Sequence, residues 1–553
     1  MSRVPLDSAR PSHRSWAVVA LLAVVALVAA ACGSKSTTSA GSAPTTQATG
    51  VYSNLPANAG TPKSGGTLAW GLEAETDSFN PTVGRWALSG HMVGSSILDP
   101  LATMGADGKA VPYLARSFTP NANNTVWTIT LRPGISYTDG EAFDANAVVV
   151  NLNAAKGSLI TSKAMTQVQS ITATGPLTVQ MTVSQPWAAL PNLFLSQVGY
   201  MLSPNQITGD IHAGDHPIGT RPFIFKEWVK NDHLTVVRNP HYWQKGLPYL
   251  DSIVWKPIPD SQQRFQDLED GTIDAMDTVT PSTITEVRAD SSLNRIEYTN
   301  GEKIFVVLNT AAAPFNNPLA RQAVATATDQ RSYIAQMGAT GIYQPVTGIY
   351  NPGQLGYLAN SGYPTANLAK AKQLVAQYQA QTGQPLSFTY SGADDINDVK
   401  SEQILDAMWR AAGIKVNVTT TDQATQVVNV VLGAYQASDF RNFGEPDPDA
   451  DAAWLYSTSI GKGADISINM PRYGTTAIDQ GLDTGRASTD PTARNTAYQA
   501  VNRGVDRGMP YIWLGRSDWT IAANSNVHGY AAATNGTIST LGPKTWVATL
   551  WRS

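Results

Sequence analysis

The sequence predicts a mixed α/β protein with at least two hydrophobic cores. From residue 65 onward, short runs of β-branched and aromatic residues alternate with stretches in which apolar residues recur every three to four positions. Such alternation of strands and helices is typical of α/β folds. The length of 553 residues exceeds the size at which a single core keeps growing, so we expect at least two lobes, each with its own core.

Each predicted element is marked by its own residue pattern. Runs bounded by Gly, Pro or Asn predict strands at 67–72, 126–131, 177–183, 223–229, 234–238, 253–258, 304–309, 386–390, 414–419 and 511–514. Helical periodicity predicts helices at 145–155, 260–269, 318–337, 367–379, 396–411 and 491–507. Asn317 before Pro318 is typical of a helix start, and Ala412 before Gly413 is typical of a helix end.

The N-terminal segment has the pattern of an export signal. Arg3, Arg10 and Arg14 precede an apolar run at 16–31, which is too short for a stable membrane span. Three alanines stand before Cys32, the only cysteine, and resemble the processing box of bacterial lipoproteins. We therefore expect residues 1–31 to be a lipoprotein signal peptide and Cys32 to be the lipidated N-terminus, located outside the cytoplasm and tied to the cell membrane. An uncleaved anchor or a plain secretory signal is the alternative.

Residues 32–63 are predicted to form a flexible tether. They are rich in Ser, Thr, Ala, Gly and Pro and contain few large apolar groups, so they cannot bury enough surface to offset the entropy of the chain. No later apolar run approaches membrane-spanning length, which predicts a globular body beyond the tether.

Composition excludes several classes of function. The chain has 38 basic and 42 acidic residues and no basic stripe after the signal, so we expect no nucleic-acid partner. One cysteine excludes internal disulfides and thiolate zinc sites. His212 and His216 are four residues apart, but Gly214 and Pro217 would break a helix there, so no metal site is expected. Nucleophile-elbow and phosphate-loop motifs are missing, and we expect neither catalysis nor a cofactor.

From about residue 65 to residue 529 the sequence resembles the family 5 extracellular solute-binding proteins, which serve peptide- and nickel-type ABC importers. The resemblance rests on phrases that follow one another in the family order, among them SGGTLAWGL, SFNPT, WTITLRPGISYTDGEAFDANAVV, HPIGTRPFIFKEW, RNPHYW, LEDGTIDA, VVLNTAAAPFNNPLARQAVATATDQ, EPDPDADAAWLY and MPYIWL. Arg221 in HPIGTRPF stands where the family usually has glycine, and the sequence offers no physical reason for it.

The resemblance implies a two-lobed periplasmic-binding-protein-like fold with an inserted third subdomain and a hinged cleft. The first lobe would comprise 64–308 and 510–553, with the insertion at about 94–212, and the second lobe would comprise 309–509. The hinge would lie near 308–310 and 508–511. Such a monomer would capture peptides in the cleft and deliver them to the ABC permease and its ATPase. Oligosaccharide, haem, a metal chelate, or a degenerate sensor or chaperone role are the alternatives.

The segment 439–456 is the main candidate for ligand binding in the second lobe. It holds Arg441, Asn442, Phe443, Glu445, Asp447 and Trp454. In peptide-binding members of the family an aspartate in this segment holds the peptide ammonium, because a buried ammonium needs a charged partner. That position aligns here with Asn442, or with Gly444 if the alignment shifts by two. Neither is a carboxylate, so Asp439, Glu445 or Asp447 would have to replace it. The alternative is a solvated turn that caps a helix at 449–457.

The loop 78–86 is the candidate from the first lobe. Its resemblance to the family loop that lines the cleft points to Phe79, Asn80 and Trp86, and Trp86 could either stack on a ligand or belong to the core. Trp409 lies on the apolar side of a predicted helix and is expected in the core.

Overall fold

The computed structural model describes residues 51–56, 60–105, 108–210, 212–299, 301–393, 396–442, 444, 447–463, 465–530 and 546–553. The predicted signal peptide, Cys32 and most of the predicted tether lie outside these residues. Within them, strands and helices alternate as the sequence predicts, and the mixed α/β class is confirmed. None of the helices in these ranges has the length and apolar character needed to cross a membrane.

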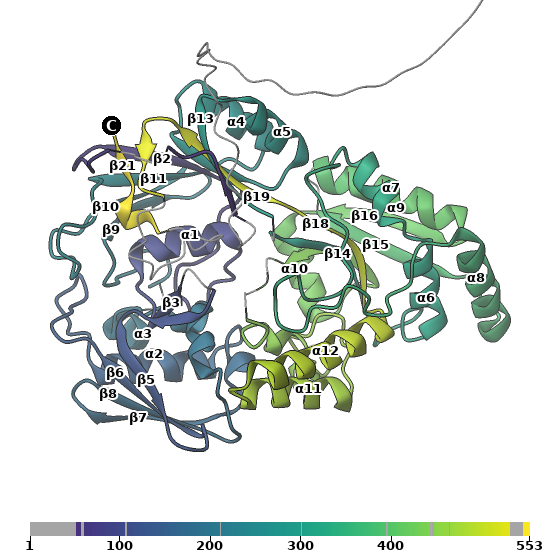
Figure 1. Ribbon diagram of the computed structural model, residues 1–553, viewed down its shortest axis with the longest axis horizontal. Coiled ribbons are helices and arrows are strands. Elements are labelled where there is room, and N and C mark those ends of the chain that lie inside the picture. Colours follow the sequence, from purple (N-terminus) through teal and green to yellow (C-terminus); the bar gives the residue numbers. More distant parts are fainter. Residues whose placement is uncertain are drawn as a thin grey trace, which may run out of the picture. The chain divides into compact units, whose positions relative to one another are not determined.

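An eight-stranded sheet gathers strands from three distant parts of the chain (Figure 1). Its order is β1 (Val51–Ser53), β13 (Leu293–Tyr298), β19 (Trp519–Asn524), β12 (Ala275–Thr278), β2 (Thr67–Leu72), β11 (Ser252–Pro257), β10 (His233–Arg238) and β9 (Phe223–Val229). The fully buried rings of Trp70 and Trp255 lie side by side in its core, with centroids 5.7 Å apart. Helices α4 (Ser261–Glu269) and α5 (Pro281–Ala289) contribute to one core of this sheet, and α1 (Leu88–Ile97) contributes to another.

A separate antiparallel sheet lies within the range predicted for the inserted subdomain. It is formed by β5 (Ala115–Pro120), β6 (Val126–Leu131), β8 (Thr178–Val183) and β7 (Val168–Gly175), in this order. Helix α2 (Ala145–Gly157) packs on it through residues such as Leu152 and forms a core of its own with Ile129 and Val179.

A five-stranded sheet carries the rest of the body. Its order is β16 (Lys415–Thr421), β15 (Ser387–Ala393), β17 (Ala437–Asn442), β14 (Lys303–Leu308) and β18 (Tyr511–Arg516). Successive side chains of β14 enter two cores. Val306 and Leu308 pack with α6 (Pro318–Ala327), α8 (Leu368–Thr382) and α9 (Ile396–Ala411), whereas Phe305 and Val307 pack with α11 (Thr476–Ala487) and α12 (Pro491–Gly508). Below, lobe I denotes the part with the eight- and four-stranded sheets, and lobe II the part with the five-stranded sheet.

Several local predictions are confirmed. The side chain of Asn317 accepts a hydrogen bond from the backbone N–H of Leu319 and caps α6, with Pro318 in the first turn. Gly413 follows α9 with a φ of +88°, the left-handed conformation that glycine adopts at helix ends. Trp409 is fully buried.

The chain crosses between the lobes at 299–302 and at 517–518, because β13 and β19 belong to lobe I while β14 and β18 belong to lobe II. The sequence-based boundaries put β14 in the first lobe and the crossings at 308–310 and 508–511, at the opposite ends of these two strands. The strand pattern of β14 gives its conformation but does not tell which sheet it joins, and this explains the difference.

Arg221 proves to be part of a buried polar cluster in lobe I. Its Nε lies 2.8 Å from Oδ1 of Asp99 and also donates to the carbonyl of Leu98. Its guanidinium packs over the rings of Tyr113 and Trp546, at 5.4 and 4.8 Å from their centroids. Burial raises the pKa of Asp99, and the charge of Arg221 opposes this shift. Arginine at this position therefore neutralises a buried carboxylate and joins distant segments of the chain.

Candidate functional site

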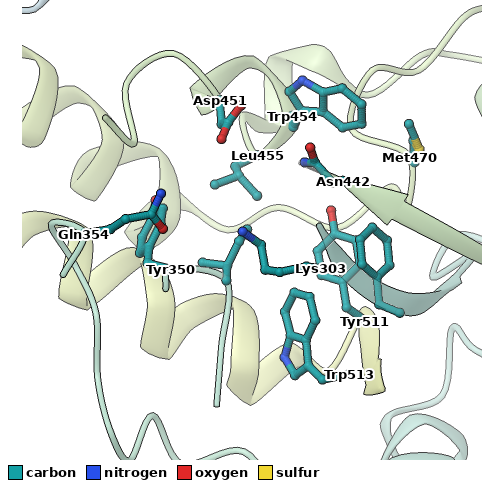
Figure 2. Close-up of a pocket in the computed structure, with 12 residues that line it drawn as sticks. Lys303, Tyr350, Gln354, Asn442, Asp451, Trp454, Leu455, Met470, Tyr511 and Trp513 are labelled. Atoms are coloured by element: carbon teal, nitrogen blue, oxygen red, sulfur yellow. The ribbon is translucent and has the colours of Figure 1, made fainter. Parts of the chain in front are cut away.

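A cavity opens in lobe II beside the first residues of β14 (Figure 2). Its empty volume, including the part open to solvent, is about 540 Å³. Its walls come from β14, β17, β18 and three loops, and consist of Lys303, Phe305, Ile349, Tyr350, Gln354, Asn442, Asp451, Trp454, Leu455, Met470, Tyr511 and Trp513. Aromatic and aliphatic side chains with a few polar groups among them are typical of sites that bind small molecules.

Lys303 is the charged residue that sheet register brings into this cavity. It is the first residue of β14 and lies opposite Asn442 of β17 and Arg516 of β18. Its side chain is only 4 % exposed. Burial lowers the pKa of Lys303 to about 8, although the charge of Asp451 acts in the opposite direction. A β-carbon at Gly444 would lie 3.1 Å from Nζ of Lys303 and 3.5 Å from Oδ2 of Asp451, so this glycine keeps the space between the two groups open.

Three aromatic rings form a continuous wall at the base of the cavity. Tyr511 and Trp513 are stacked with centroids 5.2 Å apart, and Phe305 meets both of them edge-on. The indole N–H of Trp513 donates to Asp506 at 3.0 Å, which fixes the orientation of its ring. A rigid wall of this kind can pack against a flat or apolar part of a ligand.

Two of the predicted site residues line the cavity. Asn442 reaches it from the end of β17, and its side-chain oxygen accepts a hydrogen bond from the backbone N–H of Gly444 at 2.9 Å. Trp454 reaches it from the short 3₁₀ helix η4 (Ala452–Trp454). The segment 449–457 thus holds a 3₁₀ turn where the alternative reading expected a regular helix. Phe443 and Glu445 lie outside the described residues.

Arg441, the neighbour of Asn442, is engaged in a different cluster. It donates to Glu73 at 2.8 Å and to Glu302 at 3.2 Å. Glu73 directly follows β2 of lobe I, so this ion pair links the two lobes. Burial, together with the charges of Glu73 and Asp277, raises the pKa of Glu302 to about 7 against the opposing effect of Arg441. Chiefly burial, and then the charge of Glu73, likewise raises the pKa of Asp277 to about 7.

A second link between the lobes is formed around Asp449. This buried carboxylate accepts hydrogen bonds from Nε of Arg486 at 2.6 Å and from the indole N–H of Trp187 at 2.7 Å. The guanidinium of Arg486 lies 4.1 Å from the ring centroid of Trp187, and the backbone N–H of Ala188 donates to the carbonyl of Arg486. We call Trp187, Asp449 and Arg486 the interlobe clasp, because Trp187 belongs to lobe I and the other two belong to lobe II.

Asp447 and Asp439 of the predicted segment have partners within lobe II. Asp447 receives two hydrogen bonds from the guanidinium of Arg494, at 2.7 and 2.9 Å. Asp439 is buried and accepts a hydrogen bond from the side-chain amide of Gln426 at 2.8 Å. Neither residue lines the cavity of Figure 2.

The residues predicted from the loop 78–86 lie in lobe I, away from this cavity. Phe79 packs on Trp228 with centroids 4.9 Å apart and lines a smaller cavity that shares no lining residue with the first. Asn80 accepts a hydrogen bond from the backbone N–H of Thr82. Trp86 packs edge-on against Tyr200, and its indole N–H donates to the carbonyl of Ser78 at 2.7 Å. Both of these contacts lie within lobe I.

Sequence reasoning missed Lys303, Glu73 and Glu302. For Lys303, the sequence offered one indication of a functional role, its position at the start of the apolar run KIFVVL. An ammonium at the end of a buried strand must either reach solvent or line a cavity. The two glutamates carried no comparable signal. Glu73 meets Arg441 from the other sheet, and Glu302 meets it through the pairing of β14 with β17.

Comparison of the sequence with known protein families assigns the chain to one of them. Residues 109–463 match the family of bacterial extracellular solute-binding proteins, family 5 middle region. The chain belongs to this family. It is therefore a substrate-binding protein of the ABC-importer type, and members of this family act outside the cytoplasm. Within the described residues there is no group of three His, Cys, Asp or Glu side chains placed to hold a metal ion.

Individual relatives support the assignment. The chain is 26% identical to the glutathione-binding protein GsiB of Salmonella paratyphi A over 451 residues, which cover 79% of this chain and 86% of the relative. Among solved structures, DppA of Helicobacter pylori in complex with the peptide STSA aligns with a TM-score of 0.80 and 21% identity, over 89% of this chain and 98% of that one. AgaA of A. tumefaciens R10 in complex with agropinic acid aligns with a TM-score of 0.79 and 24% identity, over 88% and 99%. The two-lobed periplasmic-binding-protein fold is thereby confirmed.

Proposed function

We propose that the protein captures small peptides or peptide-like solutes, of which glutathione is one example, and delivers them to the permease and ATPase of an ABC importer. The observation that carries the proposal is the lobe II cavity, in which a lysine, a carboxylate and two amides are set among aromatic walls. A peptide offers groups that match each of these: charged ends, a polar backbone and apolar side chains. The relatives named for glutathione and for a bound peptide support the same class of solute.

Capture would involve closure of the two lobes about the crossings at 299–302 and 517–518. The ion pair of Arg441 with Glu73 and the interlobe clasp would hold the closed form, because each joins one lobe to the other. A solute that contacts both lobes shifts the protein toward the closed form, which is the state that a permease can distinguish from the empty one. The protein would act as a monomer and without chemical change of the solute.

Within the cavity, Asp451 is the carboxylate placed to receive a peptide ammonium. Asn442 carries no charge, and Asp439 and Asp447 do not line the cavity. Asp451 lines the same cavity as Asn442 and Trp454. We therefore assign the amine-binding role to Asp451 and leave to Asn442 a neutral hydrogen bond.

Calorimetric titration tests the proposal. Wild-type protein, freed of bound solute by partial unfolding and refolding, is titrated with glutathione, with the dipeptide Met-Leu and with the tetrapeptide STSA, and any solute that co-purifies is identified by mass spectrometry. We expect saturable binding of at least one of these solutes and a peptide-like compound in the mass spectrum. Absence of binding together with a co-purified sugar or metal chelate would refute the peptide assignment.

We also propose that the protein is anchored by lipid on Cys32, at the end of the predicted tether 32–63. The apolar run and the small residues before Cys32 support this. We expect Cys32→Ser to move the protein from the membrane fraction to the soluble extracytoplasmic fraction, measured by fractionation and immunoblotting. A variant that remains with the membrane to the same extent as wild type would contradict lipid anchoring at this residue.

A further inference from the structure

We infer that Lys303 is the residue that binds a carboxylate of the solute, and that the protein selects solutes which present a negatively charged group to the lobe II cavity. The inference deepens the proposed function and rests on it for the role of the cavity in solute capture. It assigns to the ligand a charge and a point of attachment, neither of which follows from membership of the family.

Lys303 is buried, and among the described residues no carboxylate forms an ion pair with it. None of their carboxylates lies within 4.0 Å of its ammonium, and no hydrogen bond from the ammonium is found among these residues. Buried lysines are ordinarily paired, since removal of an ammonium from water is unfavourable unless an anion or several acceptors replace the water. An anion brought by the solute would supply a partner for this ammonium.

The side chain of Lys303 has the direction that a contact with a bound solute requires. Figure 2 shows the ammonium of Lys303 directed into the cavity, toward the side where Asp451 and Leu455 lie. Asn442, its partner across the β14–β17 pairing, contributes an amide, so the sheet places no carboxylate directly opposite Lys303. Gly444 leaves the space in front of the ammonium open, because any larger residue would put its β-carbon 3.1 Å from Nζ.

The rest of the cavity lining is mainly aromatic and aliphatic. Next to Lys303 stand the stacked rings of Tyr511 and Trp513, with Phe305, Leu455 and Met470 around them. A carboxylate held by Lys303 would therefore be attached to a flat or apolar body, and the amide N–H groups of Asn442 could bond a further oxygen atom of the solute. The chemical class is a small organic carboxylate, either free or as the end or side chain of a peptide.

The charges that face Lys303 determine its response to pH. They are Asp451 from the loop before η4 and Arg516 from the neighbouring strand β18, while the phenols of Tyr350 and Tyr511 have a pKa raised by burial and stay neutral. Because the pKa of Lys303 in the empty protein is lowered to about 8, the ammonium is charged at pH 7 and loses its proton as the pH rises beyond that value. Carboxylate binding should therefore weaken between pH 7 and pH 9.5.

Benzoate and benzamide are suitable probes, since they share a flat body and differ in charge. Their binding to solute-free wild-type protein, to Lys303→Met and to Lys415→Met is measured by ligand-observed NMR at pH 7 and pH 9.5. Lys415 is an exposed lysine at the start of β16 and serves as the matched control. We expect wild type and Lys415→Met to bind benzoate at least tenfold more tightly than benzamide at pH 7, and Lys303→Met to lose this preference.

Thermal unfolding separates a binding role from a structural one. If Lys303 only supported the fold, Lys303→Met would unfold at a lower temperature than wild type in the absence of ligand. We expect instead an unchanged or higher midpoint, because methionine fills the site without a buried charge. Equal affinity of wild type for benzoate and benzamide, no binding of either probe, or an unaltered preference in Lys303→Met would each overturn the inference.

The inference and the proposed function fail in different ways. If glutathione or STSA binds wild type and Lys303→Met equally well, the capture of peptides stands and the role of Lys303 is refuted. If benzoate depends on Lys303 while no peptide binds, the carboxylate site stands and the solute is a non-peptide acid.

Discussion

Replacing Asp449 by alanine is expected to lower the free energy of unfolding by about 3–5 kcal/mol at pH 7, because the substitution leaves the guanidinium of Arg486 buried without its anion. The same change removes the acceptor of the Trp187 indole and so weakens the link between the lobes. The measurement is urea unfolding followed by circular dichroism, with solute titration on the folded variant. We expect solute affinity to fall along with stability.

The matched control is Asp406→Ala, which removes the partner of Arg410 on an exposed helix surface. An exposed ion pair of this kind contributes little to stability, because water screens it. Trp187→Phe provides a narrower test, because it keeps the pair of Asp449 and Arg486 and removes the indole N–H that donates to Asp449 from the other lobe. If Asp449→Ala were no more destabilising than Asp406→Ala, the interlobe clasp would not be a buried ion pair in solution.

Arg221→Met should produce a loss of similar size, about 3–5 kcal/mol, by leaving Asp99 buried without its cation. Burial already raises the pKa of Asp99. In the variant, Asp99 can therefore bind a proton and so avoid an unpaired buried charge. Asp99 in the variant would then have a folded pKa above its unfolded value, and stability would decrease as the pH rises from about 4 toward neutrality. Urea unfolding at pH 5 and pH 8 measures this difference.

The double variant Asp99→Asn with Arg221→Met distinguishes the mechanism from a simple packing defect. Since it removes the uncompensated charge, we expect it to recover part of the stability lost in Arg221→Met and to lose the added pH dependence. A double variant as unstable as the single one at every pH would show that the packing of Arg221 on Tyr113 and Trp546 matters more than its charge.

Much of the fold was predictable because local chemistry marks its elements. The cap at Asn317, the glycine after α9 and the buried face of Trp409 follow from the sequence alone, since each depends on residues within a few positions. The boundary between the lobes was harder to predict from the sequence. β13 and β14 are separated by only four residues, so only the sheet pairings reveal that the chain changes lobe between them.

The candidate site was predictable in part for a related reason. The acidic and aromatic segment around Asn442 and Trp454 stands out by composition, and both residues line the cavity. The importance of Lys303 depends on the register between β14 and β17, which no local pattern gives. The partners of the neighbouring carboxylates also come from distant parts of the sequence. Asp447 and Asp449 form ion pairs with arginines 47 and 37 positions away.

Small-angle X-ray scattering tests the central claim, that the two lobes close over a captured solute about the crossings at 299–302 and 517–518. Wild-type protein lacking residues 1–31 is measured without solute and at saturation with a solute that binds in calorimetry, and Asp449→Ala is measured in parallel. Our account predicts a smaller radius of gyration for the saturated wild-type protein and a smaller change for the variant. An identical radius of gyration with and without bound solute would contradict it.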